Sequence, residues 1–227
     1  MTQLLIKVFT LPFYYIINIR SLLFNLYYLK FSEAIRLPIL VSSNVYMKTQ
    51  KGSITINSPI SRGMVKLGYG EIGIRDRNNS RSIWHCYGNV IFNGPATINQ
   101  GFILNINPGG KLEFGNGFTM IAASTIICNK SIKFGDNCLL SWDVQIMDSD
   151  LHKIFDANDK RINENKEIII GSKVWIGSKV VILKGVNLKD NTIVAAGSVV
   201  TRSFQNNSII IAGNPAREIK SGIHWKL

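Results

Sequence analysis

A polar stretch between Ile146 and Ile168 holds the side chains with the clearest capacity for chemistry. It contains His152, preceded closely by Asp148 and Asp150. An imidazole titrates near neutral pH, so it can take a proton from a hydroxyl and pass one to a leaving group. A solvated loop histidine with no role is an equally good interpretation at this point. Long polar insertions on a regular fold often carry function, which favours residues 147–167 as a catalytic loop.

The elements on either side of this stretch repeat with a period of six. One aliphatic set occupies every sixth position: Ile170, Ile176, Ile182, Leu188, Val194 and Val200. A second small or apolar set stands two residues earlier: Ile168, Val174, Val180, Val186, Thr192 and Ser198. Helices repeat near 3.6 residues and half-buried strands near two, so this pattern fits neither. It is typical of short strands joined by tight turns, with one hexapeptide on each face of a solenoid.

The same register recurs upstream of the polar stretch. Its members are Phe92, Ile98, Leu104, Phe114, Met120, Ile126, Phe134, Leu140 and Ile146. The register slips near Ile106 and Asn129, which indicates bulges or altered corners. Three hexads per turn give coils of about 18 residues, each of which buries its aliphatic row on the next. The pattern therefore predicts a parallel β-solenoid over most of residues 50–212.

The N-terminal segment has a different character. Residues 4–29 are rich in Leu, Ile, Phe and Tyr but too interrupted for a membrane span, and they lack a small-residue cleavage site for a signal peptide. Two interpretations stay open: residues 1–30 lie on an anionic membrane surface, or they form a helical pair packed on the protein or on another subunit. We expect an N-terminal helical segment (1–48), a β domain (49–220) and a C-terminal tail (221–227). The expected location is the cytoplasm, with any membrane contact peripheral and at the inner face.

Composition limits the classes of partner. The 227 residues include 26 Lys and Arg against 14 Asp and Glu, a net charge of +12, which favours an anionic partner. The chain contains no aromatic-basic RNA-binding module, so we do not expect nucleic acid. Cys86, Cys128 and Cys138 lack CxxC spacing, which argues against both a disulfide scaffold and a zinc site.

Four motifs point to one known family. They are Asp148-Ser149-Asp150-Leu151-His152, Val174-Trp175-Ile176-Gly177, Ala195-Ala196-Gly197-Ser198-Val199-Val200-Thr201 and Gly213-Asn214-Pro215-Ala216-Arg217. With the hexapeptide repeat, they make residues 85–220 resemble the left-handed β-helix acyltransferases. The nearest branch is the maltose/galactoside O-acetyltransferase type, and within it the capsular and exopolysaccharide O-acetyltransferases. The resemblance implies an all-β, left-handed parallel β-helix with an extruded catalytic loop and a short α-helical N-terminal segment. The handedness comes from the family alone, since crossover connections otherwise favour the right-handed form.

The resemblance also implies an activity. It suggests a homotrimer that transfers an acetyl group from acetyl-CoA to a hydroxyl of a sugar or polysaccharide precursor, without a metal. In this family a loop histidine acts as general base on the sugar hydroxyl, and His152 matches its position. Asp148 and Asp150 are candidates to orient the imidazole, although either can instead cap the loop turn. An N-acyltransferase on an amino sugar nucleotide and a non-catalytic solenoid scaffold remain the alternatives.

Family positions that hold CoA, between neighbouring subunits, match seven residues of this chain: Trp175, Ser178, Ala196, Thr201, Arg202, Arg217 and Lys220. Backbone groups of Ser178 and Ala196 would meet the pantetheine arm, and the cationic side chains suit the phosphates. Three further positions are candidates for the acceptor sugar: Asn129, Trp142 and Asp143. An indole suits a sugar face, but Trp142 fits core packing equally well.

Overall fold

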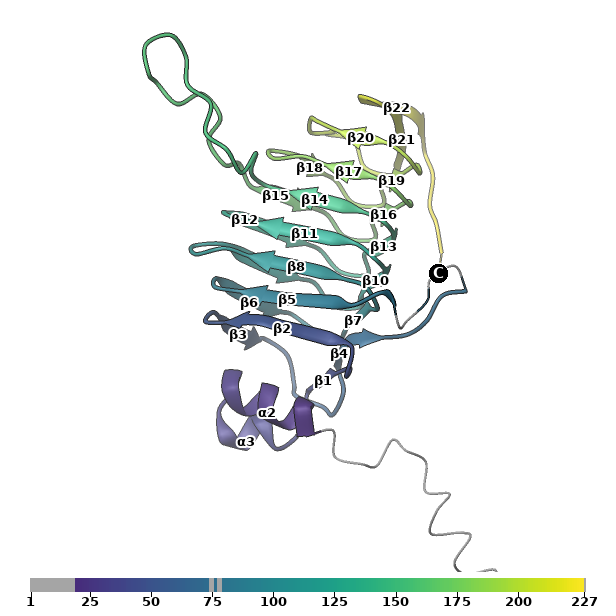
Figure 1. Ribbon diagram of the computed structural model, residues 1–227. Helices are drawn as coiled ribbons and strands as arrows, with labels where there is room; N and C mark the ends of the chain where they lie inside the picture. Colours follow the sequence, from purple (N-terminus) through teal and green to yellow (C-terminus); the bar gives the residue numbers. More distant parts are fainter. Residues whose placement is uncertain (1–18, 74–75, 77–78, 227) are drawn as a thin grey trace, which may run out of the picture.

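A coil of parallel strands, closed at its start by two short helices, makes up the computed structural model, which describes residues 19–73, 76 and 79–226 (Figure 1). The helices are α2 (Ile19–Tyr28) and α3 (Phe31–Ala34). Successive strands pass from one sheet to the next as the coil rises, in the left-handed sense (Figure 1). The predicted all-β, left-handed parallel β-helix with a short helical N-terminal segment is therefore confirmed.

Within the described residues, three sheets form the faces of the coil, and up to β20 each paired strand joins the strand three later in the chain; at the end of sheet A, β19 pairs with β21 and β21 with β22. Sheet A contains β1 (Ile39–Val41), β4 (Val65–Tyr69), β7 (Ala96–Asn99), β10 (Phe118–Ala122), β13 (Leu139–Trp142), β16 (Trp175–Ile176), β19 (Ile193–Val194), β21 (Ile209–Gly213) and β22 (Ala216–Ser221). Sheet B contains β2 (Val45–Gln50), β5 (Ser82–Cys86), β8 (Ile103–Ile106), β11 (Thr125–Cys128), β14 (Gln145–Met147), β17 (Val181–Ile182) and β20 (Val199–Val200). Sheet C contains β3 (Ser53–Ile56), β6 (Asn89–Phe92), β9 (Lys111–Phe114), β12 (Ser131–Phe134), β15 (Ile168–Ile170) and β18 (Asn187–Leu188).

The period of six is the length of one face of the coil. Leu140, Ile176 and Val194 are register partners in consecutive coils of sheet A, and all three side chains are fully buried. Sheet C contributes an aromatic row in the same way. The rings of Phe92 and Phe134 stack on either side of Phe114, with centroid distances of 5.3 and 5.8 Å. The core is thus a set of like-on-like columns that run along the coil axis.

The parallel strands begin earlier in the chain than the sequence analysis expects. The first parallel strand starts at Ile39, ahead of the boundary at residue 49. The hexapeptide pattern misses the start of the coil because the inward residues Val45 and Ile54 of the first turn and Val65 of the second are not six positions apart. Helix α2 covers the exposed edge of β1: Asn25 bonds both the N–H and the C=O of Ile39, at 3.1 and 2.7 Å. A sheet edge that would otherwise be unpaired is thereby satisfied.

The other end of the coil is closed by an antiparallel strand. β22 pairs with β21, and the tail after it turns back along the coil. Trp225 Nε1 donates a hydrogen bond to Lys173 O at 2.7 Å and holds this tail in place. In the described part of the chain, no helix is long and apolar enough to cross a bilayer.

Candidate active site

The chain leaves the coil after β14 and returns at β15, and the residues between form a projecting arm (148–167; Figure 1). Its outer part is a narrow antiparallel ribbon. Ile162 N–H donates to Ile154 O at 2.9 Å, and Phe155 bridges Arg161. The Asp156 carboxylate closes the tip by accepting the N–H groups of Asn158 and Lys160 at 2.9 and 3.0 Å. The predicted extruded loop is therefore an ordered element with its own hydrogen bonds.

Asp148 anchors the start of the arm to the coil. Its side chain is fully buried, and its carboxylate accepts three backbone N–H groups, those of Asn129, Lys130 and Ser131, at 2.7, 2.7 and 2.8 Å. These groups belong to the corner between sheets B and C in the preceding coil. Of the two roles that the sequence left open for Asp148, the geometry shows capping of a turn, in this case a coil corner. Because the buried carboxylate already accepts these three N–H groups, it does not contact the His152 imidazole within the described chain.

Asp150 and Asn163 hold the foot of the arm together. Asp150 Oδ2 accepts a hydrogen bond from Asn163 Nδ2 at 2.8 Å and forms an ion pair with Lys184 at 2.5 Å. The hydrogen bonds from Lys184 and Asn163 lower the pKa of the Asp150 carboxyl below its ordinary value. The Asn163 side chain is buried and also donates to His152 O at 2.8 Å, while its Oδ1 accepts the N–H of Ile154 at 2.7 Å. Sequence reasoning missed Asn163, because nothing in a polar loop sets one asparagine apart.

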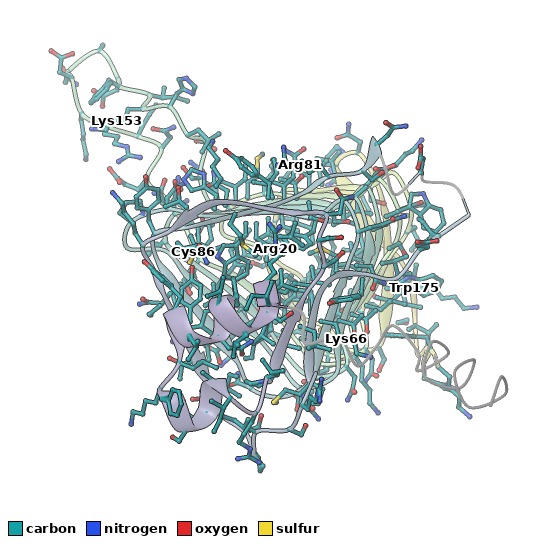
Figure 2. All side chains as sticks on the ribbon, turned by 60° about the horizontal axis from the view of Figure 1, so that its bottom comes forward. Arg20, Lys66, Arg81, Cys86, Lys153 and Trp175 are labelled. Carbon is teal, nitrogen blue, oxygen red and sulfur yellow. The ribbon has the colours of Figure 1, made fainter. Side chains whose placement is uncertain are left out.

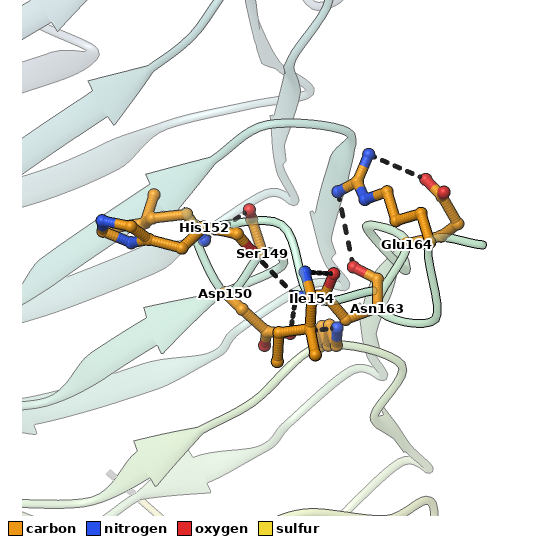
Figure 3. A network of polar contacts seen from close by, with 9 residues as sticks. Ser149, Asp150, His152, Ile154, Asn163 and Glu164 are labelled. Atoms are coloured by element: carbon orange, nitrogen blue, oxygen red, sulfur yellow. Dashed lines mark hydrogen bonds and ion pairs between the residues drawn. The ribbon is translucent and has the colours of Figure 1, made fainter. Parts of the chain in front are cut away.

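His152 has a fixed backbone and an exposed side chain. Its N–H donates to Asp150 O at 2.7 Å, and its own carbonyl accepts from Asn163. The imidazole points away from the Asp150 carboxylate into open space (Figure 3). Among residues 19–73, 76 and 79–226, neither ring nitrogen has a hydrogen-bond partner. Asp150 therefore positions His152 through the backbone and Asn163, and within one chain it does not touch the imidazole.

Three more predicted site residues lie along the same corner, between sheets B and C. Asn129 lies one coil before the arm, and its Oδ1 accepts a hydrogen bond from the side chain of Asn107. Thr201 and Arg202 directly follow β20, two coils after the arm, and both are exposed. The Arg202 guanidinium lies over the Phe204 ring, 5.4 Å from its centroid. This corner thus places exposed cationic and polar groups beside the arm.

Five further candidates lie at the opposite edge of sheet B, at its corner with sheet A: Trp142, Asp143, Trp175, Ser178 and Ala196. Trp142 and Asp143 stand there in the coil that carries the arm, and Ser178 and Ala196 in the next two coils. Ser178 O accepts the Gly197 N–H at 2.9 Å, and a Cβ on Gly177 would lie only 2.7 Å from Ala196 N. Glycine is therefore required for these two corners to stack closely.

Trp175 belongs to this second edge. Figure 2 shows it on the side of the coil opposite Lys153, which marks the arm. Trp175 is 37% exposed, and its indole donates from Nε1 to Ser141 Oγ at 3.2 Å. The ring of Trp225 lies 5.9 Å away, so the C-terminal tail packs against it. Sequence reasoning missed Trp225, whose contact depends on the path of the tail. Arg217 and Lys220 lie on β22, beyond the last coil, and both are exposed.

The comparisons with known proteins bear on this site. Residues 167–202 match the family described as bacterial transferase hexapeptide (six repeats). The chain carries the hexapeptide repeat of bacterial transferases. The resemblance inferred from its motifs is thereby confirmed, and the matched hexapeptide repeats include Trp175, Ser178, Ala196, Thr201 and Arg202.

The chain is also similar to two curated O-acetyltransferases. It is 39% identical over 119 residues to a polysialic acid O-acetyltransferase of Escherichia coli O1:K1, covering 52% of this chain and 38% of that one. It is 33% identical over 114 residues to the galactoside O-acetyltransferase of Escherichia coli K12, covering 49% and 55%. The chain therefore spans about half or less of the length of these relatives. Among solved structures, a galactoside acetyltransferase in complex with coenzyme A is 26% identical, covering 61% and 60%, with a TM-score of 0.42.

The capping role of Asp148 predicts a large effect on stability. Asp148→Ala would remove a buried carboxylate that accepts three N–H groups of a coil corner, so we expect the free energy of unfolding to fall by about 2–4 kcal/mol. Asp136→Ala is the matched control, because that exposed carboxylate accepts one N–H group, that of Asn116 at 2.8 Å. It should cost about 1 kcal/mol or less. Urea unfolding measures both, and equal losses would contradict the capping role.

The ion pair at the foot of the arm predicts a pH effect. The pKa of Asp150 is lowered in the folded protein, so its contacts stabilise the arm above the ordinary carboxyl pKa and are lost as pH falls through the lowered value. Lys184→Met removes the larger cause, so the Asp150 carboxyl should titrate at higher pH. Lys153→Met, elsewhere on the arm, should leave the titration unchanged. Carboxyl carbon NMR shifts followed against pH would contradict this account if the Lys184→Met curve matched wild type.

Proposed function

We propose that this protein is a CoA-dependent O-acetyltransferase that moves an acetyl group from acetyl-CoA to a hydroxyl of a sugar or polysaccharide precursor. The observation that carries the proposal is the presentation of His152. Its backbone is fixed at the foot of an ordered arm, while its imidazole is exposed and free to meet a substrate. The relatives named O-acetyltransferases support the choice of reaction. The cytoplasmic location stays a prediction.

The proposed reaction needs one proton carrier. The acceptor hydroxyl oxygen attacks the thioester carbonyl carbon while the His152 imidazole takes the hydroxyl proton. When the carbon–sulfur bond breaks, the imidazolium returns that proton to the thiolate, which leaves as CoA. His152 is thus the catalytic residue, and Asp150 and Asn163 are positioning residues. Acetyl-CoA is a substrate here, and its phosphates would meet exposed cations: Arg202, Arg217 and Lys220.

The distribution of the candidate residues supports a homotrimer. In one chain, the arm stands at one edge of sheet B and the Trp175–Ser178–Ala196 group at the other, separated by the width of the sheet. The outward face of sheet B carries apolar, half-buried side chains in successive coils: Ile83, Ile103, Ile127, Met147, Val181 and Val199. Packing these faces around a threefold axis would bring the arm of one chain to the second edge of its neighbour. We therefore propose that each site is shared between two subunits.

Two substitutions separate the base from the phosphate ligand. His152→Ala should lower turnover by about 10²–10⁴-fold and leave acetyl-CoA affinity nearly unchanged, because the imidazole meets the reacting hydroxyl. Arg217→Ala should weaken CoA binding by about 1–3 kcal/mol, the usual loss for a hydrogen bond to a charged group. Lys153→Ala, next to His152 on the arm, is the control for disturbance of the loop.

The measurements are CoA release with a panel of sugars, amino sugars and sugar nucleotides, and calorimetry for CoA. Full activity of a folded His152→Ala variant would place the base elsewhere. Acylation of amines alone would favour an N-acyltransferase. A protein that neither binds CoA nor turns over any acceptor would be a scaffold.

The proposed interface predicts a second result. Ile103→Asp introduces a charge on the outward face of sheet B, so it should convert trimers to monomers and abolish turnover. Ile91→Asp changes a half-buried outward isoleucine of sheet C and should leave the trimer intact. Sedimentation velocity at micromolar concentration measures both. A monomeric wild type, or a trimeric Ile103→Asp variant, would contradict the proposed interface.

A further inference from the structure

The helical cap at the start of the coil exposes a set of large apolar side chains, which we call the cap face. Their exposed fractions run from 39% to 72%: Ile19 62%, Leu23 60%, Leu26 39%, Tyr27 58%, Phe31 72% and Ile35 54%. All six lie within the α2–α3 segment and the residue that follows it. Scattered exposed apolar residues are ordinary, but six on one short segment indicate a surface that meets a partner.

Helix α2 buries the apolar residue Phe24 in the core, but its outward side is apolar as well, and two of its polar residues face inward. The polar residues Ser21 and Asn25 are fully buried, because they bond the backbone of β1: Val41 N–H donates to Ser21 Oγ at 2.8 Å, and Ile39 N–H donates to Asn25 Oδ1 at 3.1 Å. The apolar residues Ile19, Leu23 and Leu26 follow at helical spacing on the outward side. A helix that met only water there would carry polar groups on that side.

The charges beside the cap face have one dominant sign. Lys30 and Arg36 are exposed on either side of α3, and the chain as a whole carries a net charge of +12. Glu33 is the only acid between residues 19 and 48. Two copies docked through this face would bring together the Lys30 and Arg36 of each, with only Glu33 of each copy to oppose them, which disfavours self-association. An apolar and aromatic face bordered by cations matches the composition of helices that lie in the plane of an anionic bilayer.

We propose that the cap face docks on an anionic membrane surface. The apolar side chains enter the boundary between headgroups and acyl chains, and Lys30 and Arg36 meet the lipid phosphates. The α2 helix stays bonded to the coil through Ser21 and Asn25, so docking needs no rearrangement of the cap. The interaction is peripheral and independent of the proposed transferase activity.

Vesicle co-sedimentation of the full-length protein tests this inference. Wild type should bind vesicles of phosphatidylglycerol and phosphatidylcholine, bind pure phosphatidylcholine less, and lose binding as salt rises. The double variant Leu23→Glu/Phe31→Glu should reduce binding to the anionic vesicles by at least about tenfold. Ile219→Glu is the matched control, because Ile219 is 62% exposed on β22 at the other end of the coil. Melting curves check that each variant is folded.

Three outcomes would overturn the inference. Wild type could fail to bind anionic vesicles. The folded Leu23→Glu/Phe31→Glu variant could bind as well as Ile219→Glu. Sedimentation could show a larger wild-type assembly that this double variant dissolves, in which case the cap face would be an interface between copies. Turnover with a soluble acceptor is measured separately, so failure of membrane docking and failure of the proposed activity are distinguishable.

Discussion

The structure depends on the stacking of like side chains from one coil onto the next. The row of Phe92, Phe114 and Phe134 and the column of Leu140, Ile176 and Val194 show the principle, because each residue contacts its equivalent in the neighbouring coils. Each inward apolar side chain packs on its equivalents in the neighbouring coils, and the backbone groups of each strand pair with the strands above and below. The coil is therefore rigid along its axis. A polar insertion can project from such a coil without disturbing the strand register on either side. The arm between β14 and β15 is such an insertion.

The contacts between the arm and the coil fix the backbone at His152. Asp148 ties the first residue of the arm to the corner before it, and Lys184 ties Asp150 to the coil after it. Asn163 links the outgoing and returning strands of the arm at the same level. The backbone at His152 is therefore held from both neighbouring coils, while the imidazole remains free. A general base that must meet a mobile acceptor benefits from this combination of fixed position and open access.

The sequence predicts the coil well because inward positions repeat and the arm interrupts them visibly. It could not place the start of the coil, where the spacings from Val45 to Ile54 and on to Val65 depart from six. The role of Asp148 depends on coil register, which decides whether its carboxylate meets the N–H groups of the previous corner. Asn163 and Trp225 carry no pattern of their own, and their contacts arise only once distant segments are side by side. The separation of the candidate site into two edges likewise became visible only in three dimensions.

The central claim is that one site combines the arm of one chain with the opposite edge of the next. Subunit mixing tests it most directly: His152→Ala disables the arm edge, and Ala196→Trp fills the corner proposed to receive pantetheine. Each variant alone should be inactive. Mixed trimers should recover about a quarter of wild-type turnover, because a site is intact only where an unmodified arm meets an unmodified corner. If the mixture forms trimers but recovers no activity, the two edges do not act together across subunits.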